Sequence, residues 1–263
     1  MKRFNKVFTI LVLIFLYVPM LVLAVASFNR GSDIATWSGF TFSQYGELFR
    51  DGTLLPLLAN SLLLAVISAV VATVLGTMAA IGIHNMRGRL RTATIFVTNI
   101  PMTNPEIVTG VSLALLFAFA GTMLKRNDVF SFGTLLVAHV TFNLPYVILS
   151  VLPKLSQMEP DLQDAALDLG CTPLQAFFKV MIHEILPGVI SGVIMVLIPS
   201  ISTFYISQKL GNGKFYLIGD AIEGQYAANN LHFAAAIAFI LMVILLVCMA
   251  LMQRGANKKA MVV

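Results

Sequence analysis

The stretch Glu159–Pro187, EPDLQDAALDLGCTPLQAFFKVMIHEILP, lies between two long hydrophobic runs and has the pattern of a helix, a tight turn and a second helix. Asp164 places negative charge near the positive end of the first helix. Gly170 stands where a left-handed helix cap belongs, because glycine has no Cβ to clash there. Thr172 and Gln175 have the spacing of a capping box that starts the second helix. A short polar helix between two runs of membrane length is typical of a segment to which a protein outside the bilayer binds.

The composition is that of a polytopic membrane protein. Of the 263 residues, 58% are hydrophobic and 11% are charged, and the mean hydropathy is +0.89. A membrane helix needs about 20 apolar residues, so the chain has room for roughly six helices and their loops. We therefore expect an all-α fold with one transmembrane domain over residues 1–263, a loop at 154–186, and spans at about 7–28, 57–83, 92–123, 132–153, 187–206 and 232–252.

The distribution of Lys and Arg predicts the orientation of these spans. With the N-terminus inside, eleven of the 17 basic residues fall on the cytoplasmic side and six fall outside. The short loop Arg87–Arg91 and the two ends of the chain carry this bias, which is the positive-inside pattern. We expect both termini and the loop 154–186 to be cytoplasmic. The formal charge of +5 is thus a topology signal, and it does not indicate a nucleic-acid partner.

The third apolar run is interrupted by the polar stretch Asn99–Glu106, which contains two prolines. Each proline removes a backbone donor and disfavours helix for the residue before it. Irregular backbone at membrane depth occurs where it is buried in protein or lines a water-filled path. Glu106 is the one acidic residue inside the expected spans, and such carboxylates are costly. Two interpretations stand: Glu106 lines a solute pathway, or it is a structural carboxylate that accepts hydrogen bonds from freed backbone donors.

The second run carries small residues at intervals of four: Ser68, Ala72, Gly76 and Ala80. Such a ridge lets another helix approach closely, which favours helix association in a membrane. This feature predicts packing, either within the chain or against a second subunit.

No pattern of residues predicts catalysis. The four histidines share no ligand spacing, and Cys171 and Cys248 stand in no metal-like cluster. The sequence has no Walker A loop, zincin motif or Ser–His–Asp set. We expect neither a catalytic site nor a metal in this chain, and the chain is not expected to be an enzyme.

The run Asp164-Ala165-Ala166, three further residues and then Gly170 resembles the EAA loop of ABC importer permeases, although that family usually has Glu in place of Asp164. In the family this loop is a coupling helix that docks in a cleft of the cytoplasmic ATPase. The resemblance implies that Asp164, Ala165, Ala166 and Gly170 contact an ATPase. It also implies that ATP and magnesium are bound by that partner and that this chain has no cofactor of its own.

Over nearly the whole chain the resemblance is to permeases of the spermidine/putrescine type. It rests on NPEIVTGVSLALLF from Asn104, HVTFNLPYVILSVLPKL from His139, and AALDLG. The segment Pro199–Tyr226 is instead similar to the second permease of those systems. An acidic pair common in the first permease, near Ile201 and Ser202, is absent.

The resemblance implies the type I ABC importer permease fold in the inner membrane of a bacterium. The implied complex has a second permease subunit, an ATPase dimer and an extracytoplasmic solute-binding protein. Its solute would be a polyamine, a flexible polycation that carboxylates and aromatic faces attract. Glu106, Phe204 and Tyr205 are the candidate pathway residues. The alternatives are a permease for thiamine, a metal ion or an anion, or a secondary transporter, which the EAA loop disfavours because a self-sufficient carrier needs no ATPase docking helix.

Overall fold

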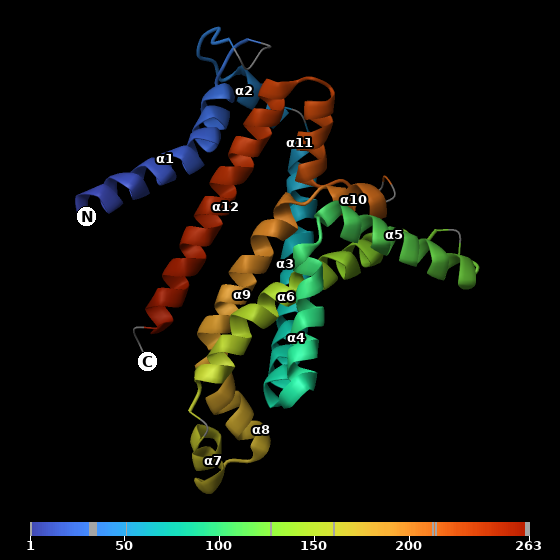
Figure 1. Cartoon of the computed structure of the whole chain (residues 1–263). Coiled ribbons are helices and arrows are strands. Elements are labelled where there is room, and N and C mark those ends of the chain that lie inside the picture. Colours follow the sequence, from blue (N-terminus) through green and yellow to red (C-terminus); the bar gives the residue numbers. More distant parts are fainter. Residues whose placement is uncertain are drawn as a thin grey trace.

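The computed structural model of the chain describes residues 2–31, 36–50, 52–126, 128–159, 161–211, 213 and 215–260. This part of the chain is almost entirely helical (Figure 1), and its one strand-like pairing is an isolated antiparallel bridge between Asn29 and Phe40. In chain order the elements are α1 (Lys2–Ala26), α2 (Ser43–Arg50), α3 (Leu54–Asn85), α4 (Gly88–Thr103), α5 (Glu106–Met123), α6 (Phe132–Gln157), α7 (Asp161–Asp168), α8 (Pro173–Ala176), the π-helical η1 (Phe177–Met181), α9 (Ile182–Ser202), α10 (Tyr205–Leu210), α11 (Ile218–Ala227) and α12 (Leu231–Ala260).

Six helical stretches of the described chain are long and apolar enough to cross a membrane: Asn5–Ala26, Leu54–Asn85, Glu106–Met123, Phe132–Gln157, Pro173–Ser202 and Leu231–Arg254. The third apolar run is two helices rather than one span over 92–123. Helix α4 ends at Thr103, and Asn104 is extended, with ψ at 138°. Pro105 forces this break because it disfavours helix for the residue before it. Helix α5 then starts at Glu106 and alone has the length of a span.

Helices α3, α6 and α9 lie side by side and form the core (Figure 1). The small-residue ridge of α3 is buried along its whole length, which confirms the predicted packing. The helices approach closely at Gly76, where an added Cβ would lie 2.7 Å from the Cβ of Val147 on α6. Around this contact, Val147, Val151 and Ile185 are fully buried. Dispersion contacts at this density stabilise the three helices where the lipid offers no hydrophobic preference.

A buried polar junction ties these three helices together near one end of α9. The amide of Asn143 on α6 donates to the hydroxyl of Ser200 on α9, with 2.6 Å between Nδ2 and Oγ. Ser68 on α3 reaches the same hydroxyl at 3.3 Å. Polar contacts of this kind fix the register of helices that apolar packing alone leaves free to slide.

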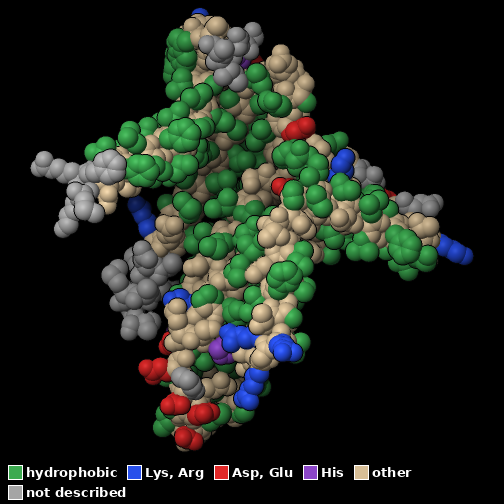
Figure 2. Space-filling view, in the orientation of Figure 1, with side chains coloured by type: hydrophobic (Ala, Val, Ile, Leu, Met, Phe, Trp, Pro, Cys, Tyr) green, Lys and Arg blue, Asp and Glu red, His purple; other side chains and the backbone are tan. Residues whose placement is uncertain are grey.

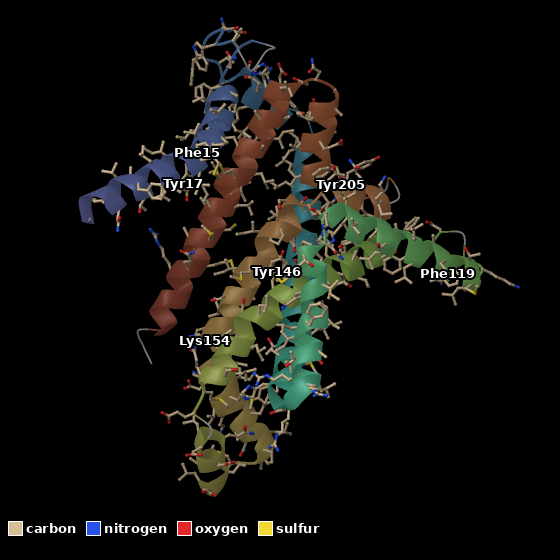
Figure 3. The ribbon with its side chains drawn as sticks, in the orientation of Figure 1. Phe15, Tyr17, Phe119, Tyr146, Lys154 and Tyr205 are labelled. Atoms are coloured by element: carbon tan, nitrogen blue, oxygen red, sulfur yellow. The ribbon has the colours of Figure 1, made fainter. Side chains whose placement is uncertain are left out.

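Helices α1 and α5 project away from the core (Figure 1). None of the most apolar 18-residue window of α1 is buried, and only 11% of the corresponding window of α5 is buried. Phe15 is 80% exposed on α1 and Phe119 is 62% exposed on α5, and both lie far from the core in Figure 3. These apolar faces need lipid or another protein subunit as a partner.

Candidate functional site

Helix α7 ends in the glycine cap that the sequence predicts. Gly170 has φ at +86°, in the left-handed region. The N–H of Gly170 donates to the carbonyl of Leu167 at 2.9 Å, and the N–H of Cys171 donates to that of Ala166 at 3.0 Å. This pair of bonds is a Schellman motif, which satisfies the last carbonyls of the helix and reverses the chain.

The predicted capping box at Thr172 is also confirmed. The Gln175 N–H donates to the Thr172 hydroxyl at 3.3 Å, and the Thr172 N–H donates to the Gln175 side chain at 3.0 Å. The helix that begins here passes through the π-turn of η1 and runs on to Ser202 without a break. The expected division between a loop ending at 186 and a span starting at Pro187 is therefore absent. Hydropathy rises at Pro187, but a proline removes only one hydrogen bond from a membrane helix and does not have to end it.

The α7–α8 hairpin (161–176) and the start of η1 present apolar side chains beside acidic ones. Leu169 is 87% exposed, Leu174 is 71% exposed and Phe178 is 64% exposed. Asp164 and Ala165 are exposed on α7, while Ala166 is buried against the hairpin. Figure 2 shows Asp and Glu side chains gathered at this end of the molecule, with Lys and Arg side chains above them. An apolar surface with an acidic rim has the character of a protein interface.

The three candidate pathway residues lie together at the opposite end of α9. Glu106, half-buried at the start of α5, accepts hydrogen bonds from the hydroxyl of Thr203 and the N–H of Ile206. Phe204 and Tyr205 lie between these two partners in sequence, with ring centroids 4.2 Å apart. Tyr205, labelled in Figure 3, is the first residue of α10, just after the end of α9. Within the described residues no Lys or Arg pairs with Glu106.

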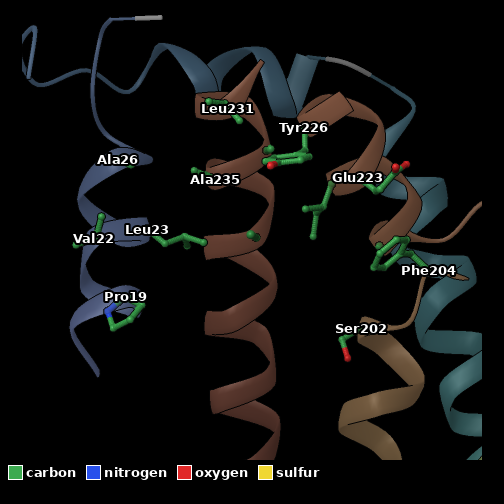
Figure 4. A pocket seen from close by; sticks show the side chains of 14 residues that line it. Pro19, Val22, Leu23, Ala26, Ser202, Phe204, Glu223, Tyr226, Leu231 and Ala235 are labelled. Atoms are coloured by element: carbon green, nitrogen blue, oxygen red, sulfur yellow. The ribbon is translucent and has the colours of Figure 1, made fainter. Parts of the chain in front are cut away.

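Two cavities lie near the end of α9. A groove of about 740 Å³ follows α6 and α9 from Ser191 to Ser202, with Tyr146 on its other wall. A second cavity of about 530 Å³ lies between α1, α11 and α12 (Figure 4), and Ser202 and Phe204 line it from α9 and the turn that follows. Ser202 thus borders both cavities, whereas Ile201 is fully buried.

Sequence reasoning missed two residues of this region. Thr203 is the side-chain partner of Glu106, and 97 positions separate the two. Asp220, on α11, is 8% exposed and accepts hydrogen bonds from the Ser207 hydroxyl at 2.8 Å and the Leu217 N–H at 2.7 Å. Burial raises the pKa of the Asp220 carboxyl, and these two donors oppose the rise. The available signal was the spacing of three positions between Leu217 and Asp220. At this spacing the side chain at N3 of a helix can accept a hydrogen bond from the N–H of the N-cap residue.

No group of three or more His, Cys, Asp or Glu side chains in the described residues could hold a metal ion. The arrangement offers hydrogen bonds, aromatic faces and carboxylates, namely Glu106, the buried Asp220 and Glu223, which lines the second cavity. These groups suit passage and recognition of a cation.

Comparison with known proteins identifies the family of this chain. Residues 72–260 match the family model of the binding-protein-dependent transport system inner membrane component. The putrescine transport system permease protein PotI of Escherichia coli (strain K12) is 34% identical over 196 residues, which are 74% of this chain and 69% of PotI. The spermidine/putrescine transport system permease protein PotC of Haemophilus influenzae is 30% identical over 98% of this chain and 99% of its own length.

Solved structures show the same fold at low sequence identity. A bacterial ABC transporter that imports the acidic polysaccharide alginate has a TM-score of 0.72 at 15% identity, covering 98% of this chain and 96% of that one. The MetNI methionine ABC transporter in an inward-facing conformation has a TM-score of 0.57 at 18% identity, covering 78% of this chain and 93% of that one. The chain belongs to the family of binding-protein-dependent transport system inner membrane components and is a multi-span permease subunit of a bacterial ABC importer.

Proposed function

We propose that this permease passes a polyamine, putrescine or spermidine, from an extracytoplasmic binding protein to the cytoplasm. The observation that carries the proposal is the hydrogen bonding of Glu106 to Thr203 and Ile206, the two residues that flank the Phe204–Tyr205 ring pair in sequence. The neighbouring Ser202 and Phe204 line the cavities at this turn. A carboxylate without a basic partner and aromatic faces are the groups that attract an alkylammonium ion. The names of the relatives, which are putrescine and spermidine permeases, support the same solute class.

The α7–α8 hairpin is the proposed docking site for an ATPase dimer, which binds ATP and magnesium. Asp164, Ala165, Ala166 and Gly170 form its first helix and turn, and the exposed Leu169 provides an apolar anchor. Because the helix from Pro173 to Ser202 is continuous, a displacement of the hairpin reaches the turn at 202–204.

A second permease subunit would cover the exposed faces of α1 and α5. Both termini and the hairpin lie in the cytoplasm in this proposal.

Glu106→Gln is expected to lower putrescine uptake roughly tenfold, because the variant loses the charge while retaining an acceptor oxygen for one donor. Thr203→Val is the matched control, since it removes the hydroxyl that bonds Glu106 and keeps the carboxylate. Uptake is measured in proteoliposomes that contain the purified complex with its ATPase and second permease. Complex yield should be unchanged in both variants.

Two outcomes would count against this role of Glu106. Normal uptake by the Gln variant would remove the charge from the pathway. An equal loss in Glu106→Gln and Thr203→Val would assign Glu106 to the structural role, in which it holds the turn after α9.

Cys171 provides a test of docking and orientation together, because it follows Gly170 in the hairpin and is a free, partly exposed thiol. A membrane-impermeant maleimide should label Cys171 in inside-out vesicles and leave it unlabelled in right-side-out vesicles. Removal of the ATPase should raise the labelling rate several-fold by uncovering the hairpin. Cys248, within α12, serves as the internal control. Labelling from the opposite side would reverse the proposed topology, and a rate that is independent of the ATPase would contradict the docking site.

A further inference from the structure

The segment after α9 is a closed loop whose two ends touch. A Cβ added to Gly219 would lie 2.7 Å from the carbonyl oxygen of Thr203, so the backbones at the two ends are in contact. Within the loop, a Cβ on Gly211 would lie 2.6 Å from the carbonyl oxygens of both Ser207 and Phe215. Compact loops with adjacent ends are packed by their own side chains and are frequently functional. The described residues of this segment, 203–211, 213 and 215–219, are called the α10 loop below.

One side of the α10 loop is a hydrophobic anchor. Ile206, Leu210 and Leu217 are at most 1% exposed, and they share a buried cluster with Leu64 of α3 and Leu135 of α6. The other side carries Phe204 and Tyr205, which are half-buried. The apolar anchor sets the depth of the loop, but non-directional contacts of this kind do not by themselves fix the orientation of the ring pair.

Directional contacts come from buried polar groups. Asp220, directly after the loop, accepts hydrogen bonds from the Ser207 hydroxyl and the Leu217 N–H, at positions close to the two ends. The N–H of Ile218 donates to the hydroxyl of Ser61 on α3 at 2.8 Å, which attaches the closed end to the core. Hydrogen bonds to a buried carboxylate are short and strong, so Asp220 restrains both limbs of the loop.

We infer that Asp220 is a positioning residue for solute passage: it holds the α10 loop so that Thr203 and Ile206, on either side of Phe204 and Tyr205, bond Glu106. Ser207, which Asp220 binds, lies two positions after Tyr205 and next to Ile206, whose N–H bonds Glu106. A shift of Ser207 therefore moves the rings and the donor to Glu106 together. The inference rests on the proposed passage of a polyamine past these residues.

Asp220→Asn tests this inference in the assembled transporter. An asparagine oxygen can still accept the Leu217 N–H, but its NH2 group can only donate to the Ser207 oxygen, so the Ser207 proton is left to the carbonyl of Phe204 at 2.7 Å. We expect the KM for putrescine to rise about tenfold, with a smaller change in maximal rate, because a charge-assisted hydrogen bond is lost. We also expect discrimination between putrescine and spermidine to weaken. Ser207→Ala should give a smaller shift in the same direction, and Glu47→Gln, which removes an exposed charge on α2, should give none.

A cross-link measures the loop position without any solute. A Cβ at Gly110 on α5 would lie 3.6 Å from the side chain of Ile206, so Gly110→Cys with Ile206→Cys should form a disulfide once Cys171 and Cys248 are replaced by Ser. The added Asp220→Asn substitution should slow this cross-link several-fold. An unchanged cross-linking rate, or a lower yield of transporter with unchanged KM and selectivity, would overturn the positioning role. If wild-type transporter carries neither polyamine, the proposed solute is wrong, and the cross-link still decides whether Asp220 positions the loop.

Discussion

Gly170→Val should abolish coupled transport while leaving membrane insertion intact. Gly170 has φ at +86°, and a Cβ there would meet nothing within 4 Å, so the substitution strains the backbone without a steric clash in this chain. The left-handed region costs an ordinary L-residue roughly 1–2 kcal/mol, and a β-branched residue more. The Schellman turn would open and α8 would leave its place beside α7. We expect the ATPase to be lost during purification and uptake to fall more than tenfold.

Gly170→Asn is the matched control. Asparagine also places a side chain at the tip of the hairpin, but it visits the left-handed region far more readily than valine. Most of the uptake should therefore survive in the Asn variant. If both variants lose the ATPase equally, the ATPase requires that position 170 carry no side chain. The backbone conformation at this position would then not be the cause. If Gly170→Val co-purifies with the ATPase and transports normally, the hairpin is not the docking site.

Gly76→Leu should have the largest effect on stability. The first added atom alone would lie 2.7 Å from the Cβ and 2.8 Å from a γ-carbon of Val147, so α3 and α6 would have to separate. Overpacking of a dense core costs about 1–3 kcal/mol, and here the two helices would also lose their buried contacts with α9. The expected result is aggregation in detergent at a temperature at least several degrees lower than for the wild type, as measured by size-exclusion chromatography after heating.

Gly82→Leu on the same helix is the control, because a Cβ at Gly82 meets nothing within 4 Å. It introduces the same leucine side chain, with the same helix propensity, on an exposed face of α3. Equal thermal aggregation of the two variants would mean that the loss of glycine, rather than the contact with Val147, determines the outcome.

The fold is predictable from local signals to a large extent. Apolar runs of membrane length, the glycine cap at Gly170 and the capping box at Thr172 each act within one or two helical turns. The break before Glu106 follows from Pro105 for the same reason. These features need no knowledge of the neighbours in space, so the chain alone specifies them.

The remainder depends on contacts between distant positions. The bond between Thr203 and Glu106 exists because α9 ends at Ser202 and α5 starts at Glu106, and a difference of one turn in either helix would separate them. The π-turn of η1 has no local signature, since it differs from an α-turn by a shift of one hydrogen bond. The continuity through Pro187 is set by packing, which outweighs the preference of one residue.

We expect the unbroken helix from Pro173 to Ser202 to act as a lever. Its 30 residues rise about 45 Å at 1.5 Å each. Close contact of Gly192 with Val147, where an added Cβ would lie 3.3 Å from the Cα, provides a fulcrum between its ends. With the fulcrum at Gly192, a tilt of about 10° swings the Pro173 end by roughly 5 Å and the Ser202 end by roughly 2.6 Å, in opposite directions. A displacement of the hairpin end of the helix therefore moves the Ser202 end in the opposite direction. This movement is large enough to break the hydrogen bond between Thr203 and Glu106.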